Sequence, residues 1–134
     1  MIFGLDTSVL IRVLSGDPEE LALAALGFLF DRRESGDRVR VSELVVAESY
    51  YALQHHYGAS KRDALAALLQ FLESPGIECD DGVVELLSTS GMESAKPGFV
   101  DRVIHRNYLR SGADRVATFE RAAVTLPGAI VLPP

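Results

Sequence analysis

Four acidic side chains spread along the sequence are the residues best suited to chemistry: Asp6, Glu48, Asp101 and Glu120. Asp6 directly follows residues 2–5, an apolar run short enough to predict a buried strand. Glu120 follows another β-prone run, residues 116–118. Because open parallel sheets bind their ligands beyond the carboxyl ends of their strands, we expect Asp6 and Glu120 at the same sheet edge.

The other two acids belong to predicted helices. Glu48 lies in an otherwise apolar helical segment that begins at Leu44, where a carboxylate either extends to solvent or pairs with a buried group. Asp101 lies in the first turn of a helix that follows Pro97 and Gly98. The free backbone N–H groups of such a turn favour a negative charge.

Each acid taken alone also has a structural interpretation, as a helix cap, a helix-dipole partner or a partly exposed helix residue. The four acids together favour a metal site instead, because several carboxylates converging on one sheet edge repel one another unless a cation lies among them. Hard oxygen ligands of this kind suit Mg²⁺ or Mn²⁺. We therefore predict a divalent-metal site built from the four carboxylates.

Strands and helices are expected to alternate along the chain. The strand candidates are residues 2–5, 39–41, 77–79, 116–118 and 129–132. The helices are expected at residues 8–14, 17–36, 44–57, 60–73, 83–92 and 99–110, with a short one from Phe119. This alternation predicts an α/β fold with a mostly parallel central sheet of four or five strands flanked by helices.

Capping residues mark several of the predicted helix starts. Asp17 is expected to cap the second helix, and Ser60 with Asp63 forms a capping-box pattern. Either Asp80 or Asp81 is expected to cap the helix that follows.

Composition narrows the class of protein. A chain of 134 residues suits one domain. The single cysteine, Cys79, cannot form a disulfide within the chain, which fits a reducing compartment such as the cytoplasm. No apolar stretch is long enough to span a membrane. The net charge is −6, yet six basic residues crowd one stretch: Arg102, His105, Arg106, Arg110, Arg115 and Arg121.

Four short motifs carry the acids in a fixed order. They read LDTSVL from Leu5, SELVVAE from Ser42, GFVD from Gly98 and ATFER from Ala117, the last followed by LPG at 126–128. In these motifs the sequence resembles the PIN-domain ribonucleases, specifically the VapC-type toxins of toxin–antitoxin pairs. The resemblance covers nearly the whole chain and implies a single PIN-like domain over residues 1–134.

The resemblance implies a metal-dependent endoribonuclease that hydrolyses RNA phosphodiester bonds with Mg²⁺ or Mn²⁺. Asp6 and Asp101 would be the principal metal ligands, and Glu48 and Glu120 would complete the site. Neighbouring hydroxyls would support these acids: Thr7, Ser8 and Thr118. Basic side chains after Asp101 would hold the RNA backbone: Arg102, His105 and Arg106. The implied partners are the RNA substrate, a cognate antitoxin protein and a second copy in a homodimer.

The sequence departs from the family pattern at two positions. The fourth family acid is usually aspartate and here is Glu120, whose longer side chain could hold a second ion less firmly. Gly98 stands where the family often has a polar capping residue. These departures keep an alternative open, in which the chain is a catalytically weak PIN fold that binds RNA or serves regulation.

Other α/β classes with acidic or phosphate sites fit the sequence poorly. A receiver domain needs a lysine after a late strand, and neither Lys61 nor Lys96 is so placed. A phosphatase of the haloacid-dehalogenase type needs a second aspartate where Ser8 stands. No glycine-rich phosphate loop ending in lysine is present.

Aromatic residues on the predicted helix of Glu48 have two interpretations. Tyr50, Tyr51 and Tyr57 could stack on nucleic-acid bases, although packing in the core or in a dimer is more typical. His55 and His56 are adjacent and face different directions on a helix, so they are not expected to form a ligand pair.

Overall fold

The strands of this protein are all parallel and form two sheets. A computed structural model describes residues 1–134. The chain divides into two compact units, Met1–Ser88 and Thr89–Pro134. The first holds a three-stranded sheet in the order β1-β2-β3, and the second holds the pair β4-β5. The α/β class with parallel pairing is therefore confirmed. The five strands are divided between two small sheets, so the expectation that Asp6 and Glu120 follow strands of the same sheet is wrong. The single-domain expectation stays a prediction.

The sheet of the first unit consists of β1 (Ile2–Gly4), β2 (Arg38–Arg40) and β3 (Ile77–Glu78). Val39 of the central strand is buried, whereas Ile2 of β1 is 45% exposed. The expectation of a buried strand over residues 2–5 is wrong for β1, because β1 is an outer strand of this sheet, whereas Leu5 just after it is buried. Its Phe3 ring instead packs edge-on against Phe28, with ring centroids 5.6 Å apart.

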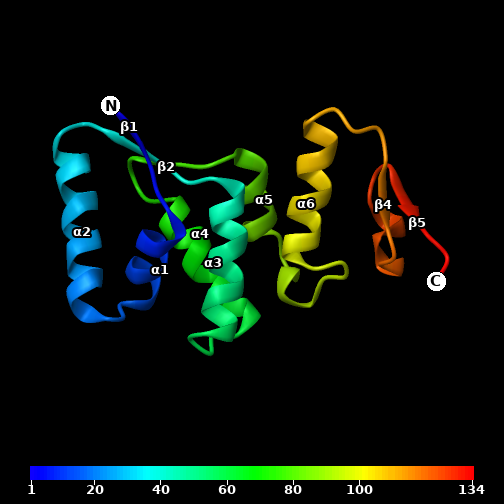
Figure 1. Ribbon diagram of the computed structural model, residues 1–134, viewed down its shortest axis with the longest axis horizontal. Helices are drawn as coiled ribbons and strands as arrows, with labels where there is room; N and C mark the ends of the chain where they lie inside the picture. Colours follow the sequence, from blue (N-terminus) through cyan, green and yellow to red (C-terminus); the bar gives the residue numbers. More distant parts are fainter. The chain divides into compact units, whose positions relative to one another are not determined.

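Five helices complete the first unit: α1 (Thr7–Ser15), α2 (Glu19–Glu34), α3 (Glu43–His55), α4 (Lys61–Leu72) and α5 (Asp81–Ser88). Helix α1 packs against both α2 and α3, and α4 packs against α3 and α5 (Figure 1). The core between them is formed by fully buried side chains, including Leu10, Val46, Leu68 and Val83. Within one helix the buried residues recur at helical spacing, as Ala64, Leu65, Leu68, Phe71 and Leu72 do in α4, which is why the sequence predicted the helices within a few residues.

The helix starts show which capping expectations hold. Ser60 Oγ accepts a hydrogen bond from Asp63 N at 3.0 Å, as expected. Asp80, not Asp81, caps α5, because its Oδ1 accepts from Gly82 N at 2.9 Å. The expected cap by Asp17 is wrong. Its backbone N–H donates to Ser15 Oγ in a local turn, and the N-cap of α2 is the next residue along.

The second unit contains α6 (Phe99–Arg110), β4 (Val116–Thr118), β5 (Ala129–Val131) and two short 3₁₀ helices, η1 (Met92–Ser94) and η2 (Arg121–Thr125). Helix α6 has the predicted bounds, and its Phe99 is almost fully buried. The helix expected to reach Met92 ends earlier, since that residue begins η1. Gly128 before β5 has φ +69°, and a Cβ there would lie 2.9 Å from Asp114 O, so this turn requires glycine.

Candidate active site

Asp6 lies between β1 and α1 in the first unit. Its backbone carbonyl accepts from Val9 N and Leu10 N, both at 3.1 Å, so it occupies the N-cap position. Its side chain, however, caps no backbone N–H group. The exposed carboxylate accepts only from Ser8 Oγ, at 3.0 Å to Oδ2. The capping interpretation therefore does not account for this carboxylate.

Glu48 lies on α3 and receives a hydrogen bond from Thr7 Oγ1, 2.5 Å from its Oε1. This contact joins the first turn of α1 to the middle of α3, so Glu48 lies beside the segment that carries Asp6. The buried face of α3 is formed by Val46, Ser49, Tyr50 and Leu53. Glu48 is on the opposite, exposed face, where Leu44 one turn earlier is 80% exposed. Its carboxylate is thus open to solvent and not enclosed by apolar side chains.

Asp101 is the third residue of α6 in the second unit. Gly98 is the N-cap of this helix and offers no side chain to the free N–H groups. Asp101 is exposed, and its side chain makes no hydrogen bond or ion pair. Its negative charge is favourable at the helix start, yet its carboxylate oxygens accept no hydrogen bond from the protein.

Arg102 holds the loop that precedes α6. Its Nε donates to Pro97 O at 2.8 Å, and its Nη2 donates to Lys96 O at 3.4 Å. These bonds hold the start of α6, where Gly98 provides no capping group. They also occupy the guanidinium group that the family resemblance predicted to bind RNA.

His105, also assigned to RNA, is only 6% exposed. Its Nε2 lies 2.5 Å from Pro127 O. Because a carbonyl oxygen only accepts, Nε2 must carry the proton in this contact. His105 therefore ties α6 to the turn before β5, while Arg106, one residue later, is partly exposed.

Glu120 has a structural role in the second unit. Its Oε1 accepts from Ala122 N at 3.1 Å and so caps η2. Thr118 Oγ1 accepts from Glu120 N at 3.0 Å, which supports the backbone and not the carboxylate. No hydrogen bond reaches the second oxygen, Oε2.

The family model of the PIN domain matches residues 4–124, which include all four acids and run through both units. The chain belongs to the PIN-domain family. PIN domains are generally nucleases, so the fold is of nuclease type. No curated protein and no solved structure matched the chain significantly.

The acids of this PIN domain are divided between its two units, with Asp6 and Glu48 in the first and Asp101 and Glu120 in the second. Neither unit by itself brings together three acidic, histidine or cysteine side chains that could hold a metal ion. The donors are all carboxylate oxygens, which suit Mg²⁺ or Mn²⁺ chemically. That the four acids share one site stays a prediction.

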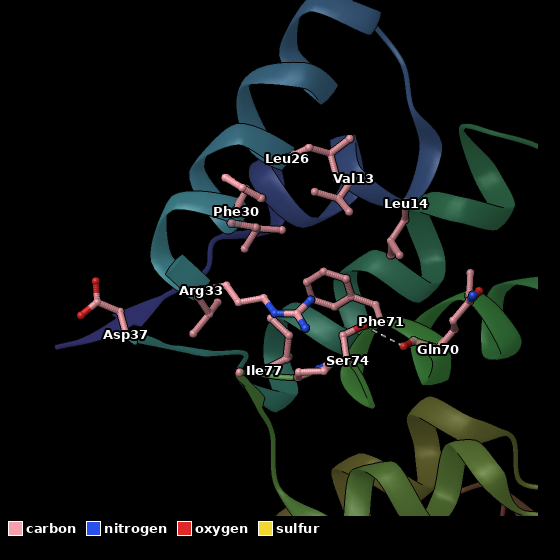
Figure 2. Close-up of a pocket in the computed structure, with 15 residues that line it drawn as sticks. Val13, Leu14, Leu26, Phe30, Arg33, Asp37, Gln70, Phe71, Ser74 and Ile77 are labelled. Carbon is pink, nitrogen blue, oxygen red and sulfur yellow. Dashed lines mark hydrogen bonds between the residues drawn. The ribbon is translucent and has the colours of Figure 1, made fainter. Parts of the chain in front are cut away.

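A pocket that the sequence did not indicate lies in the first unit of the PIN domain, with a volume of about 670 Å³. Apolar side chains of α1, α2 and α4 line it, among them Val13, Leu26, Phe30 and Phe71, and Arg33 extends into it (Figure 2). Neither Asp6 nor Glu48 contributes to its lining. The pocket is therefore separate from the candidate acids of this unit.

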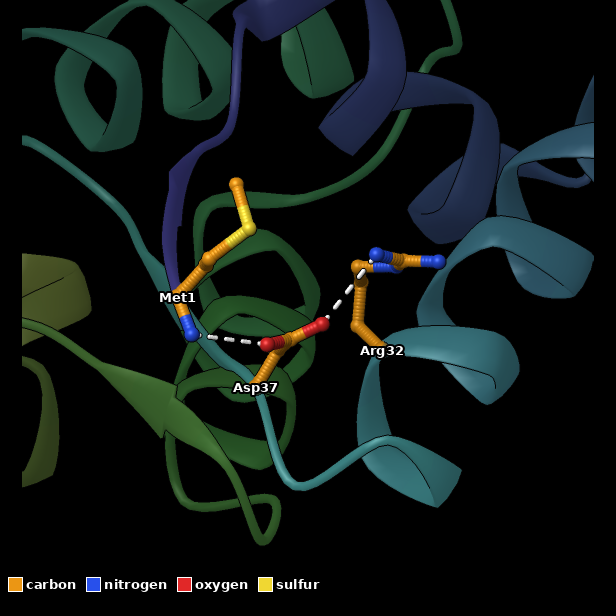
Figure 3. A network of polar contacts seen from close by, with 3 residues as sticks. All are labelled: Met1, Arg32 and Asp37. Carbon is orange, nitrogen blue, oxygen red and sulfur yellow. Dashed lines mark hydrogen bonds and ion pairs between the residues drawn. The ribbon is translucent and has the colours of Figure 1, made fainter.

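An ion-pair network also joins three elements of the first unit. Asp37 Oδ1 accepts from the N-terminal ammonium of Met1 at 2.8 Å, and its Oδ2 lies 3.1 Å from Arg32 Nη1 (Figure 3). The hydrogen bond from the ammonium lowers the pKa of Asp37, with a smaller contribution from Arg32. The Arg32 guanidinium also lies 4.8 Å from the centre of the Phe3 ring. None of the four acids belongs to this network, which stabilises the fold.

No helix in the structure has both the length and the apolar character needed to cross a membrane.

Proposed function

We propose that this PIN domain is a metal-dependent endoribonuclease in which Asp6, Glu48, Asp101 and Glu120 act together. The observation that carries the proposal is the hydrogen bond from Thr7 to Glu48. It keeps Glu48 next to the segment of Asp6, and neither of these exposed carboxylates is used to cap a helix or to pair with a cation. Membership of a family of nucleases supports the same function.

The side chains would divide the work according to their freedom in the fold. Asp6 and Asp101 would be the principal metal ligands, because neither carboxylate caps a backbone N–H group. Glu48, held by Thr7, and Glu120, through its free Oε2, would complete the site. A bound Mg²⁺ or Mn²⁺ would supply an activated water and neutralise charge developing on the phosphate. Ser8 would keep the Asp6 carboxylate in one orientation.

The RNA backbone would be held by the basic side chains of the second unit. Arg102 and His105 contact the protein's own backbone, so the exposed Arg115 and Arg121 of that stretch are the better-placed contacts. The chain carries a net charge of −6, so this local basic surface must offset repulsion of the phosphates.

We also infer, from the resemblance to VapC-type toxins, that the protein is the toxin of a toxin–antitoxin pair. It would act in the cytoplasm as a homodimer and be inhibited by its antitoxin. Induced expression of the chain alone is then expected to arrest growth, and Asp6→Asn is expected to relieve the arrest. Arrest by both forms would contradict the toxin assignment.

The alternative function is a catalytically weak PIN fold that binds RNA or regulates. It is favoured by the cap that Glu120 provides to η2, because a carboxylate used for folding need not bind a metal. In that case the purified protein would bind RNA without cleaving it.

Incubation of total RNA with the purified protein separates the two functions. We expect cleavage with Mg²⁺ or Mn²⁺ and none in a chelator. Asp6→Asn and Thr7→Val are both expected to reduce cleavage, the first almost completely and the second partly, because valine keeps the shape of Thr7 but cannot donate to Glu48. Thr7→Ser, which keeps the donor, is the matched control. RNA binding without metal-dependent cleavage by the native protein would support the alternative.

A further inference from the structure

One face of α3 exposes a stripe of four residues that includes Glu48. Leu44, Glu48, Tyr51 and His55 follow one another at intervals of three or four residues, and all are exposed. At 100° per residue they lie within an arc of about 60°, and they extend roughly 16 Å along the helix. The stripe therefore leads from the proposed catalytic carboxylate toward the end of α3.

Two rings of this stripe are stacked on each other at the protein surface. The centroids of Tyr51 and His55 lie 5.9 Å apart and their planes differ by 24°. Tyr51 also lies beside the buried Tyr50, with ring centroids 6.0 Å apart. Although 48% of Tyr51 is exposed, its ring is thus held by neighbours on two sides. A ring that is already oriented loses little freedom when a ligand stacks on it.

The other tyrosines near α3 are not available in this way. Tyr50 is 5% exposed and belongs to the core. Tyr57 accepts a hydrogen bond from Arg12 Nη1 at 2.8 Å, which ties it to the end of α1. Tyr51 is therefore the tyrosine of this helix that can offer a ring face to a ligand beside Glu48.

We propose that Tyr51 and His55 form a stacking platform for a base of single-stranded RNA, next to the nucleotide whose phosphate lies at Glu48. This inference rests on the proposed nuclease function and specifies its substrate. A base can stack on a protein ring only after it leaves a duplex, so the platform selects single-stranded regions over paired ones. Because every base has a flat face, the platform can bind RNA of different sequences. Stacking also needs no positive charge, which suits a protein with a net charge of −6.

The test measures binding of a labelled, unstructured RNA strand in a chelator, so that no metal-dependent cleavage takes place. Tyr51→Leu keeps an apolar side chain but removes the ring, and we expect it to weaken binding about fivefold or more. Tyr51→Phe keeps the ring and should bind as the native protein does. Phe30→Ala removes a ring of α2 that is 62% exposed and should have no effect.

Two further readouts identify stacking as the cause. A fluorescent adenine analogue in the strand is quenched when it stacks, and Tyr51→Leu should abolish that quenching. The loss of affinity in this variant should also be the same at low and high salt, because stacking is not an ionic contact. The native protein should bind the strand more tightly than the corresponding duplex.

Several results would overturn the proposal. They are unchanged binding by Tyr51→Leu, equal binding of strand and duplex, or no binding of the strand by the native protein. A change of oligomeric state in Tyr51→Leu at unchanged RNA affinity would assign this face to contact between copies of the chain. Native protein that cleaves RNA while Tyr51→Leu binds normally would refute the platform alone. Native protein that binds through Tyr51 but never cleaves would refute the nuclease function alone.

Discussion

At the scale of single residues, the four acids differ in how much the fold depends on them. Asp6 and Asp101 cap no backbone N–H group with their side chains. Glu48 is held by the Thr7 hydroxyl, and Glu120 is held by a backbone N–H group of η2. Substitution of Glu120 should therefore affect both the stability of the fold and the cleavage of RNA. Two different substitutions at this position separate the two effects.

The variants Glu120→Gln and Glu120→Ala differ in whether they keep a side-chain oxygen for the Ala122 N–H group. Glutamine keeps an oxygen that can accept from Ala122 N, so we expect its melting temperature to match that of the native protein. Alanine removes the cap and should lower the free energy of unfolding by about 0.5–1 kcal/mol. Both variants lose the negative charge and should lose most metal-dependent cleavage. Full cleavage by Glu120→Gln would mean that Glu120 serves folding only.

At the scale of elements, α6 begins without a side-chain cap. Gly98 has φ −75° and ψ −176°, an extended conformation that serine adopts readily, and a Cβ there would meet no atom within 4 Å. Gly98→Ser is therefore expected to raise the free energy of unfolding by about 0.5–1 kcal/mol, through a new cap and a less flexible unfolded chain. Chemical denaturation measures the change.

Gly16→Ser is the matched control for this prediction. Gly16 follows α1 with φ +70°, where a side chain is strained. The same replacement should therefore destabilise the protein at Gly16. A loss of stability at Gly98 as well would show that the start of α6 tolerates no side chain.

Asp37 ties β1 to α2 and should make stability depend on pH. Its pKa in the folded protein is lowered from 3.8, mainly by the hydrogen bond from the Met1 ammonium. A lowered folded-state pKa means that the carboxylate stabilises the fold above about pH 3.8 and that this contribution disappears as the pH falls through the folded pKa. Asp37→Asn should thus melt at a lower temperature than the native protein at neutral pH, and the difference should close in acid.

Asp31→Asn serves as the control, because Asp31 is exposed and has no ion-pair partner. It should cause no loss of melting temperature that disappears in acid. Thermal melting of both variants across the acid range checks the prediction. A constant deficit for Asp37→Asn at every pH would mean that the network does not act through charge.

Comparison of the elements with the sequence shows which features are local. The bounds of α6 and β4 agree with the sequence because local signals mark them. Helical periodicity between Gly98 and Gly112 marks α6, and a short run of β-prone residues marks β4. The exposure of β1 depends on its position in the sheet, which no local pattern reports. Asp17 resembles a cap, but α2 begins one residue later, with Pro18 as its N-cap, and the Asp17 backbone N–H group donates to Ser15 Oγ in a local turn.

For the candidate site, too, the sequence predicts the local features but not those that depend on packing between distant residues. The positions of Asp6 and Glu120 after strands could be inferred from the run of apolar residues. The burial of His105 could not, because its partner Pro127 is distant in the sequence. The pairing of Thr7 with Glu48 and the stacking of Tyr51 on His55 also depend on packing between or along helices. A helical pattern identifies which residues share a face but not which of them meet.

At the scale of the whole molecule, net charge and apolar surface act in opposition. The protein carries a net charge of −6, which keeps dissolved copies apart. At the same time α2 exposes Leu23, Leu26 and Phe30, whose spacing puts them on one side of the helix. An apolar surface of this kind favours association wherever repulsion is weak.

The exposed side of α2 therefore gives the protein an unusual colloidal behaviour. Added salt shortens the range of the repulsion to about 10 Å at 0.1 M and less at higher concentrations, while it leaves the attraction of the apolar side chains intact. The second virial coefficient from light scattering should fall as salt is added, and turbidity should appear first in concentrated, salty solutions. Dilute buffers of low ionic strength should keep the protein clear during purification and storage.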